Sequence, residues 1–493
     1  MIYNSTRNKE NITTSKNAVL KGIAEDGGLY IFKGSENFDF DWKSTIGKST
    51  FNIASSVLCF LLPDYSKEQM EDLIIKAYKG KFEDDELTPT VKVGEDYILE
   101  LFRGPTSAFK DVALSMLPQL ITAAKKDLGE TDEIVILTAT SGDTGKAALE
   151  GFHDVDGTKI IVFYPDGGVS QIQKAQMVTQ EGNNVSVCAI KGNFDDAQTG
   201  VKNIFAEVEK SGILNGKGVK LSSANSINIG RLAPQVVYYF KSYSDLVTSG
   251  EIELGEKINF AVPTGNFGDI LAGYIAKLMG LPVGKLICAS NKNDVLTEFL
   301  NTGTYNRKRE FYKTESPSMD ILVSSNLERL LYLLSVEDDK LIAKYMKQLS
   351  EDGVYTVNET IKKKADELFF AGSCDDEKTA ETIKEVFENH GYLCDTHTAV
   401  GYNVAQQFRQ NADNSLKTVV LSTASPYKFP VSVLSALGIT PPSDEFDTMD
   451  KLNEKTGVAT PKNLSTLKGK NALHTDVIEK QDMIKYVLKK VEK

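Results

Sequence analysis

The sequence predicts an α/β protein with parallel sheets, preceded by a helical N-terminal domain. Two observations lead to this prediction. From about residue 95 onward, short β-branched runs that are almost continuously apolar alternate with helical stretches. Strands of this kind are buried on both faces, as the strands of parallel sheets are. Before residue 90 the patterns are helical instead, at 49–62 and 66–82.

The N-terminal helices have recognisable limits. The stretch 66–82 opens with Ser66, a residue type that caps helix N-termini, and Glu68 and Glu71 follow near the positive end of the helix. The acidic, turn-like stretch EDDELTP at 83–89 then predicts a domain boundary. The first domain is therefore expected to end before residue 95.

The remaining elements follow in a regular order. We expect strands at 133–140, 158–165, 184–190, 258–263, 285–290 and 417–424, with helices such as 110–126 and 194–210 between them. The three runs between 133 and 190 are predicted to form a small βα domain. Ligands bind beyond the carboxyl ends of strands in such folds. The last fifty residues are polar and predict a helical tail with a structural or solvent-facing role.

Composition narrows the classes of function. The chain has 493 residues, of which 41% are apolar and 25% charged, and its net charge is −12. An acidic protein gains no electrostatic help in binding nucleic acid or anionic lipid, so neither is expected as a partner. No apolar run approaches a bilayer span and the N-terminus shows no signal pattern, so the cytoplasm is the expected compartment. The five cysteines lack metal-ligand spacing, and Cys188 and Cys288 are expected to be buried thiols.

The stretch ILTATSGDTGKAAL at 136–149 superficially resembles a P-loop. That motif needs a glycine where this chain has Thr140, and a serine or threonine after the lysine, where Ala147 follows Lys146. A nucleoside triphosphate is therefore excluded. The stretch predicts a strand-to-helix loop whose N–H and hydroxyl donors hold another anion.

Lys110 is the candidate nucleophile. It lies beside Phe109 at the entrance to an apolar helix that begins near Asp111. Apolar neighbours and the positive end of a helix favour the neutral amine, which a Schiff-base lysine requires. A solvated lysine in the first helical turn is the alternative interpretation.

Three further stretches offer polar groups at strand ends. The turn 264–269, TGNFGD, combines two glycines with a helix N-terminus and predicts a cradle for a small phosphate monoester. The stretch NSINIGR at 225–231 could bind a second phosphate through Arg231, or could be a cap cluster in which Ser226 caps the helix. Thr423 and Ser425 could be turn formers, or could donate to a ring nitrogen.

These stretches together resemble the threonine synthase family of pyridoxal-phosphate enzymes. The phrases GPTSAFKD, TATSGDTGKAA, NSINIGR, VPTGNFGD, SPSMDILVSSNLERLL and STASPYKF occur in the family's order, and the opening resembles its N-terminal domain. The similarity runs from about residue 3 to about 430 and is closer to the microbial and fungal branch than to the plant branch. It implies the fold type II architecture, that of the tryptophan synthase β chain, with two three-layer parallel-sheet domains.

The resemblance implies the positions of the cofactor residues. Lys110 would form the Schiff base with pyridoxal phosphate, and Thr423 would meet its pyridine nitrogen. Asp143 stands where relatives usually have the asparagine that approaches the 3′-oxygen of the cofactor, so one of the two groups must carry a proton. The phosphate of the cofactor would be held by the turn comprising Gly265, Asn266, Phe267, Gly268 and Asp269.

The resemblance also implies a substrate and a reaction. Thr140, Ser141 and Thr144 would bind the α-carboxylate, and Lys146 would point to solvent. The substrate phosphate would be bound by Asn225, Ser226, Asn228 and Arg231. The implied reaction converts O-phospho-L-homoserine and water to L-threonine and phosphate, with Lys110 as the repeated acid–base catalyst.

Alternatives and secondary assignments remain at this point. The same cofactor could serve a phospho-lyase that makes 2-oxobutyrate or a serine/threonine dehydratase, and a non-catalytic metabolite-binding protein is the alternative outside enzymes. The loop Ser316–Asp320 matches the family without a derivable role, so helix capping is the default. The four histidines are interpreted as structural, with His397 the one of interest.

The domain division and the assembly are expectations as well. The predicted domains are 1–95, then 96–132 with 222–440 as the large cofactor-binding domain, 133–221 as the small domain, and 441–493 as a helical tail. A monomer or a homodimer is expected, acting on a small-molecule substrate without a metal.

Overall fold

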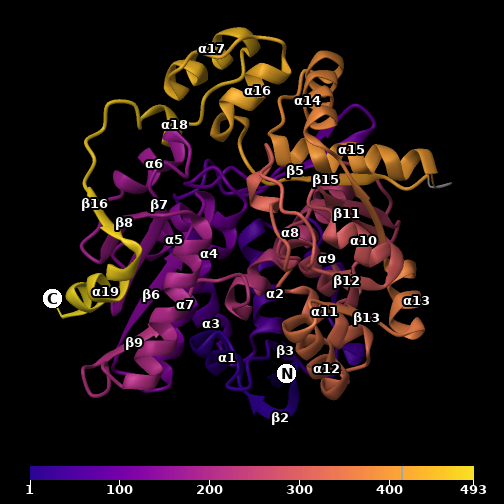
Figure 1. Cartoon of the computed structure of the whole chain (residues 1–493). Helices are drawn as coiled ribbons and strands as arrows, with labels where there is room; N and C mark the ends of the chain where they lie inside the picture. The colour runs from indigo at the N-terminus through magenta and orange to yellow at the C-terminus, as the bar shows by residue number, and fades with distance from the viewer. Residues whose placement is uncertain (412–414, 493) are drawn as a thin grey trace.

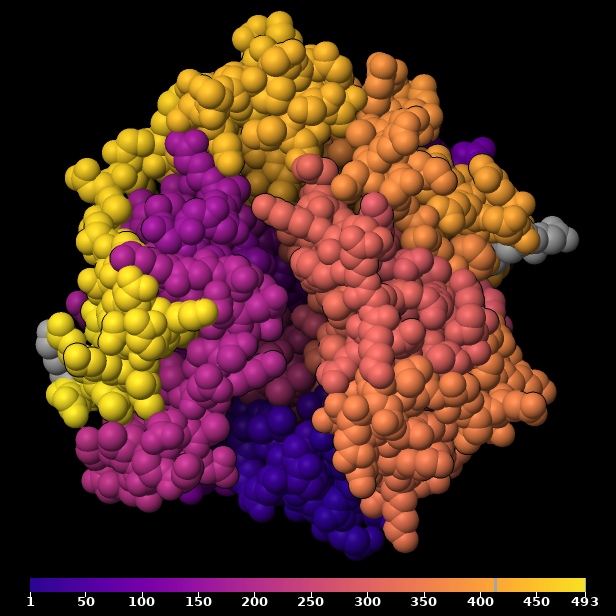
Figure 2. All heavy atoms as spheres, viewed as in Figure 1, coloured from indigo at the N-terminus to yellow at the C-terminus, as the bar shows by residue number. Residues whose placement is uncertain are grey.

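The structure, a computed structural model, describes residues 1–411 and 415–492. Two lobes lie side by side in Figure 1, each built on one mainly parallel sheet, with the N-terminal segment below and between them. Figure 2 shows a groove that runs between the magenta lobe and the part of the chain near residue 300. In the described part of the chain no helix is long and apolar enough to span a bilayer.

The larger sheet has six strands in the order β14-β11-β10-β15-β5-β4. All neighbours are parallel except β4 and β5, which are antiparallel. The strands are β4 (Thr90–Val93), β5 (Asp96–Glu100), β10 (Ile258–Pro263), β11 (Val283–Ser290), β14 (Phe369–Ser373) and β15 (Thr418–Ser422).

Helices cover both faces of this sheet. Phe260 and Val262 of β10 belong to the core that includes α8 (Ile229–Thr248) and α9 (Gly268–Leu278). Ala261, between them, points to the opposite face and packs with α15 (Thr396–Asn411). Successive side chains of a strand alternate in direction, so one apolar run supplies both cores. The three-layer α/β expectation is confirmed.

The smaller sheet has five parallel strands in the order β16-β8-β7-β6-β9. Its central strands match the expected runs closely. The strands are β6 (Glu133–Ala139), β7 (Thr158–Pro165), β8 (Val185–Lys191), β9 (Val219–Ser222) and β16 (Asp476–Glu479). Their carboxyl ends lead into the helices α5 (Asp143–Phe152), α6 (Gln171–Val178) and α7 (Phe194–Ser211).

The expectation of a helical tail at 441–493 is wrong in part. Figure 1 shows the C-terminal segment leaving the large lobe through α17 (Glu445–Thr456) and α18 (Lys462–Ser465) and crossing to the small lobe. There β16 becomes the edge strand beside β8, and α19 (Met483–Val491) packs with α7. The strand was missed because it is only four residues long, with polar residues at both ends, and because it pairs with a distant part of the chain.

The N-terminal part is mainly helical, as expected, with α1 (Ser15–Lys21), α2 (Thr50–Leu61) and α3 (Lys67–Tyr78). Ser66 caps α3 by accepting a hydrogen bond from the Gln69 N–H. The same part of the chain also forms a small antiparallel sheet that the sequence did not indicate, in the order β2-β1-β3. Its strands are β1 (Tyr3–Ser5), β2 (Asn8–Thr13) and β3 (Tyr30–Phe32).

The remaining helices and strands complete the lobes. The two-stranded sheet pairs β12 (Thr304–Asn306) with β13 (Val354–Thr356). The other helices are α4 (Lys110–Asp127), α10 (Val295–Thr302), α11 (Leu327–Leu334), α12 (Asp339–Glu351), α13 (Glu359–Leu368), α14 (Asp376–His390) and α16 (Pro430–Ala436). The division of the chain into domains stays a prediction, amended by the position of β16.

Candidate active site

Lys110 is the first residue of α4, and main-chain hydrogen bonds fix its position. The Phe109 N–H donates to the Thr423 carbonyl at 2.8 Å, and the Ser425 N–H donates to the Ser107 carbonyl at 3.1 Å. Both bonds join the turn before α4 to the segment that follows β15. Lys110 and Thr423 therefore meet at the carboxyl end of the large sheet, where α/β proteins bind ligands.

The amine of Lys110 lies in a confined, polar environment. The side chain is only 10% exposed. Its Nζ lies 3.6 Å from the Asp143 Oδ2 and donates to the Ser318 Oγ at 3.2 Å. Burial lowers the pKa of Lys110; Asp143 opposes this effect, and the charges of Lys428 and Arg231 add to it. The lowered pKa favours the neutral, nucleophilic amine.

Asp143 connects Lys110 to a second lysine. The Lys428 Nζ lies 2.8 Å from the Asp143 Oδ1, and Gln173 Nε2 donates to the same oxygen at 3.1 Å. Burial by itself would raise the pKa of Asp143, but Lys428 and Lys110 outweigh it, and the pKa lies well below its usual range. Asp143 is therefore an ionised carboxylate between the side-chain nitrogens of Lys428 and Lys110.

Lys428 is a site residue that the sequence analysis missed. It is fully buried and donates a second hydrogen bond to the Thr106 carbonyl at 3.0 Å. The residue is part of the STASPYKF stretch, but nothing in that spelling indicates a partner 285 positions earlier in the chain. Only the packing of the 3-10 helix Pro426–Lys428 against the start of α5 brings the two together.

The turn from β10 into α9 has the form expected of an anion cradle. Phe267 adopts a left-handed conformation with φ of 61°, and Gly268 opens the helix. A Cβ on Gly265 would lie 2.8 Å from the Ser318 carbonyl oxygen, so only glycine fits there. The Ser324 Oγ donates to the Gly265 carbonyl, which fixes the turn from the side opposite the strand. Exposed N–H groups at a helix N-terminus favour an anion.

The carboxylate of Asp269 is engaged by two tyrosines. It accepts hydrogen bonds from the hydroxyls of Tyr238, at 2.5 Å, and Tyr239, at 3.2 Å. Burial raises the pKa of Asp269 to about 6. The expected contribution of this residue to the anion cradle stays a prediction, and it would come from the main-chain N–H in the first turn of α9.

In the loop predicted to bind the substrate phosphate, Asn228 has a structural role, whereas Asn225 and Ser226 remain accessible. Asn228, not Ser226, caps α8, because its Oδ1 accepts the Gly230 N–H at 2.8 Å. Its Nδ2 donates to the Val19 carbonyl at 2.9 Å, so both ends of this amide are engaged. Asn225 is exposed and Ser226 half-buried, which leaves these two side chains accessible to a ligand.

Arg231 has the surroundings of an anion-binding residue. It is 4% exposed, and its Nη1 donates to the Ala224 carbonyl at 2.8 Å. Its buried Nε has no hydrogen-bond partner, and no ion pair joins it to a carboxylate within the described residues. Burial lowers the pKa of Arg231 to about 10. A buried guanidinium without a counter-ion is costly, so this site favours an anionic ligand.

One side chain links the two phosphate-binding candidates. The Asn326 Nδ2 donates to the Ser226 carbonyl at 3.2 Å and to the Asn266 carbonyl at 3.0 Å. Its Oδ1 accepts from Arg329, which also donates to the Ile227 carbonyl. Both residues lie in the SSNLERLL stretch, for which the sequence analysis derived no role.

The loop between β6 and α5 is shaped by its own threonine. The Thr140 Oγ1 accepts the N–H groups of Gly142 and Gly145, each at 2.9 Å. Ser141 is exposed and Thr144 half-buried, so their hydroxyls face an accessible space. The expectation for Lys146 is wrong: the residue is buried and donates to Glu150 at 2.9 Å and to Gln180.

The Ser316–Asp320 loop lies at the site and does not cap a helix with its side chains. Ser318 donates through its Oγ to the Asp143 Oδ2 at 3.4 Å, and its N–H donates to the His397 Nε2 at 3.1 Å. The His397 Nδ1 lies 2.7 Å from the buried Asp395 carboxylate. An accepting Nε2 requires the hydrogen on Nδ1, so Asp395 fixes this tautomer. His397 positions the loop that contacts Lys110.

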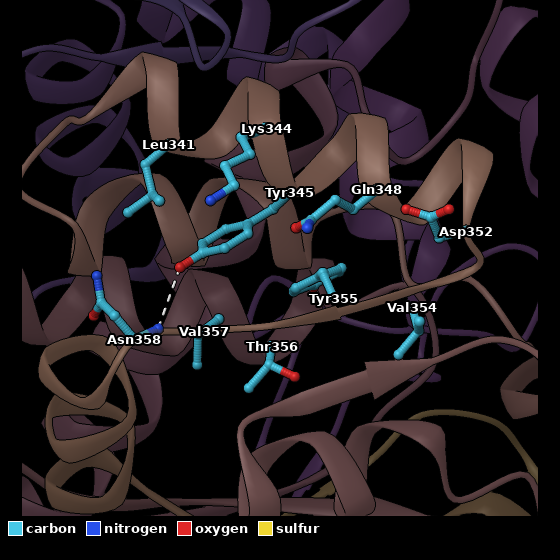
Figure 3. Close-up of a pocket in the computed structure, with 10 residues that line it drawn as sticks. All are labelled: Leu341, Lys344, Tyr345, Gln348, Asp352, Val354, Tyr355, Thr356, Val357 and Asn358. Atoms are coloured by element: carbon cyan, nitrogen blue, oxygen red, sulfur yellow. Dashed lines mark hydrogen bonds between the residues drawn. The ribbon is translucent and has the colours of Figure 1, made fainter.

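A separate surface hollow of about 590 Å³ lies between α12 and the strand β13 (Figure 3). Tyr345 and Tyr355 stack in its wall, and the Tyr345 hydroxyl accepts the Asn358 N–H. No residue that the sequence analysis assigned to the site lines this hollow. The candidate chemistry is confined to the groove around Lys110.

Comparisons with known proteins agree with this site. Three sequence models match the chain: "Pyridoxal-phosphate dependent enzyme" over residues 94–424, "Threonine synthase N terminus" over 2–78, and "Threonine synthase, C-terminal" over 398–472. The threonine synthase of Pseudomonas aeruginosa is 39% identical over 442 residues, which are 88% of this chain and 90% of that protein.

Structural comparison gives the same result. The crystal structure of the pyridoxal-phosphate-bound threonine synthase of Brucella melitensis matches with a TM-score of 0.87 and 36% identity, covering 100% of both chains. Threonine synthase-like 1 of Pongo abelii is 38% identical over 86% of this chain, and that match spans only 58% of the longer relative. From the matches over nearly whole chains, the protein belongs to the threonine synthase family of pyridoxal-phosphate-dependent enzymes.

Proposed function

We propose that the chain is a threonine synthase, which converts O-phospho-L-homoserine and water to L-threonine and phosphate with pyridoxal phosphate as its cofactor. One observation carries the proposal. A buried lysine of lowered pKa lies at the carboxyl end of the large sheet, close enough to the buried, carboxylate-free Arg231 for their charges to interact. The lysine suits the cofactor, and the arginine suits a substrate that has a phosphate of its own.

The residues around Lys110 fit the proposed cofactor. Lys110 would hold the cofactor through its amine, and the main chain of Gly265–Gly268, at the start of α9, would receive the phosphate. Thr423 lies beside Phe109 at the strand end, where its hydroxyl could meet the ring nitrogen. When bound, pyridoxal phosphate supplies an aldehyde for amines and a ring that withdraws electrons from the substrate α-carbon.

The charge of Asp143 determines how it would meet the 3′-oxygen of the cofactor. Lys428 keeps the carboxylate ionised, so the carboxylate accepts hydrogen bonds and has no proton to donate. The proton of any hydrogen bond between the two oxygens would therefore be on the cofactor side. Asp143 would thus differ from the asparagine of relatives, which can donate at this place.

The two remaining loops would hold the ends of the substrate. The hydroxyls of exposed Ser141 and half-buried Thr144, on a loop that Thr140 shapes, would bind the α-carboxylate. The phosphate would contact the unpaired Nε of Arg231 and the accessible side chains of Asn225 and Ser226. Asn228 would contribute by holding the start of α8 in place.

Lys110 would act as the acid–base group of the reaction. With the substrate held through its amine, Lys110 would be free to take the α-proton of the substrate, for which its lowered pKa suits it. A β-proton would also be removed, phosphate would leave the γ-carbon beside Arg231, and a proton would be returned to the γ-carbon, which becomes the methyl group. Water would then add its hydroxyl at the β-carbon, and Lys110 would return a proton to the α-carbon to complete threonine.

The phosphate pocket also discriminates between related activities. A serine/threonine dehydratase has no use for a buried cation that is free to bind a second phosphate. A phospho-lyase shares the same substrate and differs only in its product, 2-oxobutyrate. Arg231 therefore supports a phosphorylated substrate, and the product decides between threonine synthase and phospho-lyase.

The test combines trapping with product analysis. The purified protein is reduced with borohydride and digested, and the peptide that carries the cofactor is identified by mass spectrometry. The expected result is a single modified peptide containing Lys110, together with threonine and phosphate in equal amounts from phosphohomoserine. Cofactor trapped on another lysine, or 2-oxobutyrate as the main product, would contradict the proposal. The oligomeric state is tested separately by light scattering, with a monomer or homodimer expected.

A further inference from the structure

The Lys110 amine shares one carboxylate with a lysine that has no role in the proposed reaction. Lys428 reaches the Asp143 Oδ1 at 2.8 Å, and Lys110 lies 3.6 Å from the Asp143 Oδ2. Lys428 is 0% exposed and Asp143 is 5% exposed, so water does not screen the pair. A buried lysine is costly unless it is paired, and here the partner is the carboxylate nearest the reactive amine.

The position of Lys428 is fixed by more than this ion pair. Its ammonium also donates to the Thr106 carbonyl, in the turn that precedes Lys110. Thr106 is held in turn by Asp111, whose Oδ2 accepts the Thr106 N–H at 2.8 Å. Lys428 is therefore attached to both elements that carry the reactive groups: the turn before α4 and the start of α5.

We propose that Lys428 is a positioning residue that holds the Asp143 carboxylate ionised beside the Lys110 amine and thereby sets the charge state of Lys110. The inference deepens the proposed function, since it concerns the amine that the cofactor would occupy. Lys110 would not be available as an ammonium partner of Asp143 while it holds the cofactor. Lys428 would stay beside the carboxylate throughout, since it has no role in the proposed reaction.

The electrostatic surroundings determine the direction in which Lys428 shifts the pKa of Lys110. Lys428 repels a charge on Lys110 directly, and it also engages the carboxylate that would otherwise stabilise that charge. Four charged or titratable groups surround Lys110: Asp143 on α5, Lys428 at the end of the 3-10 helix Pro426–Lys428, Arg231 on α8 and Asp269 on α9. His397 on α15 faces Asp143. Among these groups, Asp143 raises the pKa of Lys110 and Lys428 lowers it.

Two substitutions should therefore shift the pKa of Lys110 in opposite directions. Lys428→Met removes the repulsion and leaves Asp143 to Lys110 alone, so the pKa of Lys110 should rise by about one unit. At a pH below that pKa this leaves about tenfold less neutral amine. Asp143→Asn leaves Lys110 beside Lys428 without a carboxylate, so its pKa should fall by a similar amount. If the role of Lys428 were purely structural, the two substitutions would not shift the pKa of Lys110 in opposite directions.

The measurement does not depend on the proposed cofactor. The full-length chain, freed of bound cofactor, is labelled with trace acetic anhydride across a pH series, and the acetylation of the Lys110 peptide is quantified by mass spectrometry. Lys428→Arg keeps the charge and should leave the titration of Lys110 unchanged. Lys241→Met is the matched control, because Lys241 is buried too but pairs with Glu86 and Asp245. It should not move the Lys110 titration.

The outcomes separate this inference from the proposed function. A raised Lys110 pKa in Lys428→Met, with a lowered one in Asp143→Asn, supports the inference even if no threonine is made. An unchanged or lowered pKa in Lys428→Met overturns it even if the protein is a threonine synthase. If Lys428→Met does not fold, Asp143→Asn and Lys428→Arg decide: an unchanged or raised Lys110 pKa in Asp143→Asn, or a shifted one in Lys428→Arg, overturns it.

Discussion

Two strand-to-helix turns of this protein begin alike and end differently. One follows β6 in the small sheet, the other β10 in the large sheet, and each starts with a buried threonine whose N–H donates to the neighbouring strand. Thr140 donates to the Phe163 carbonyl at 3.0 Å, and Thr264 donates to the Ala289 carbonyl at 2.9 Å. Each turn then delivers an acidic residue, Asp143 or Asp269, into the first turn of the next helix.

The two acids have opposite electrostatic environments. Lys428 and Lys110 hold the pKa of Asp143 well below its usual range despite burial. Burial against the hydroxyls of Tyr238 and Tyr239 raises the pKa of Asp269 to about 6. The same local pattern therefore gives a charged neighbour of Lys110 in one turn and a carboxyl group bonded to two tyrosines in the other. The partners that decide this come from distant parts of the chain.

The largest effect is expected where the two turns converge. Lys110→Ala removes the acid–base group, and product formation from phosphohomoserine should fall by at least about 10³-fold. The visible absorbance of a lysine-bound cofactor should disappear as well. Lys146→Ala provides a comparison, since Lys146 is paired with Glu150 and should not be needed for this absorbance. Retained turnover in Lys110→Ala would contradict the role of Lys110 as the acid–base group.

The rigidity of the large-sheet turn is tested by two alanine substitutions. A Cβ at Gly265 would lie 2.8 Å from a main-chain oxygen, which cannot easily move, whereas a Cβ at Gly268 would lie 3.4 Å from the Asn326 Nδ2. We expect Gly265→Ala to weaken cofactor binding about tenfold or more and Gly268→Ala to weaken it less. Equilibrium titration of the cofactor measures both. Equal effects would show that the close approach of Ser318 does not shape this turn.

The small-sheet turn depends on its threonine in a different way. The Thr140 Oγ1 accepts two N–H groups within the loop, whereas the Thr264 Oγ1 only donates to the Val262 carbonyl. Thr140→Val leaves two buried donors without partners and should cost about 2 kcal/mol of stability of the loop. This should appear as a severalfold or greater rise in the KM for phosphohomoserine. Thr264→Val should change KM less, and the reverse order would contradict the comparison.

The last expected effect is a change in the pH dependence of stability. A folded-state pKa of about 6 lies above the unfolded value of about 4, so the contribution of Asp269 is complete below pH 4 and is lost as pH rises through 6. The loss is about 3 kcal/mol. Asp269→Asn should reduce the fall in unfolding free energy between pH 4.5 and 7.5.

Denaturant unfolding at the two pH values measures this change. Asp111, whose pKa burial also raises to about 6, contributes with the same sign, so part of the fall should persist in Asp269→Asn. The low pKa of Asp143 places its titration below pH 4, and Asp143→Asn should leave the fall between pH 4.5 and 7.5 unchanged. A fall of the same size in Asp269→Asn and in the unaltered chain would refute the environment assigned to Asp269.

The sequence indicated the residues of the site better than their partners. The strand ends at Thr140, Thr264 and Thr423 were predictable, because buried parallel strands are continuous apolar runs and the polar residues after them share one edge of a sheet. Lys110 was identified from its apolar neighbours at a helix start. The sequence offered Ser226 as a helix cap only as the alternative to phosphate binding, and the structure uses Asn228 to cap α8, since several polar residues there could cap equally well.

The alternation of strands and helices could be predicted from the sequence, as could the glycine turns and the candidate nucleophile, because these features depend on neighbours a few positions apart. The packing of the whole chain was needed to show that Lys428 pairs with Asp143, that Ser318 contacts Lys110 and is held by His397, and that β16 completes the small sheet. Those contacts join residues that are far apart along the chain. Charge states and strand pairing depend on what lies close in space, and no local pattern specifies that.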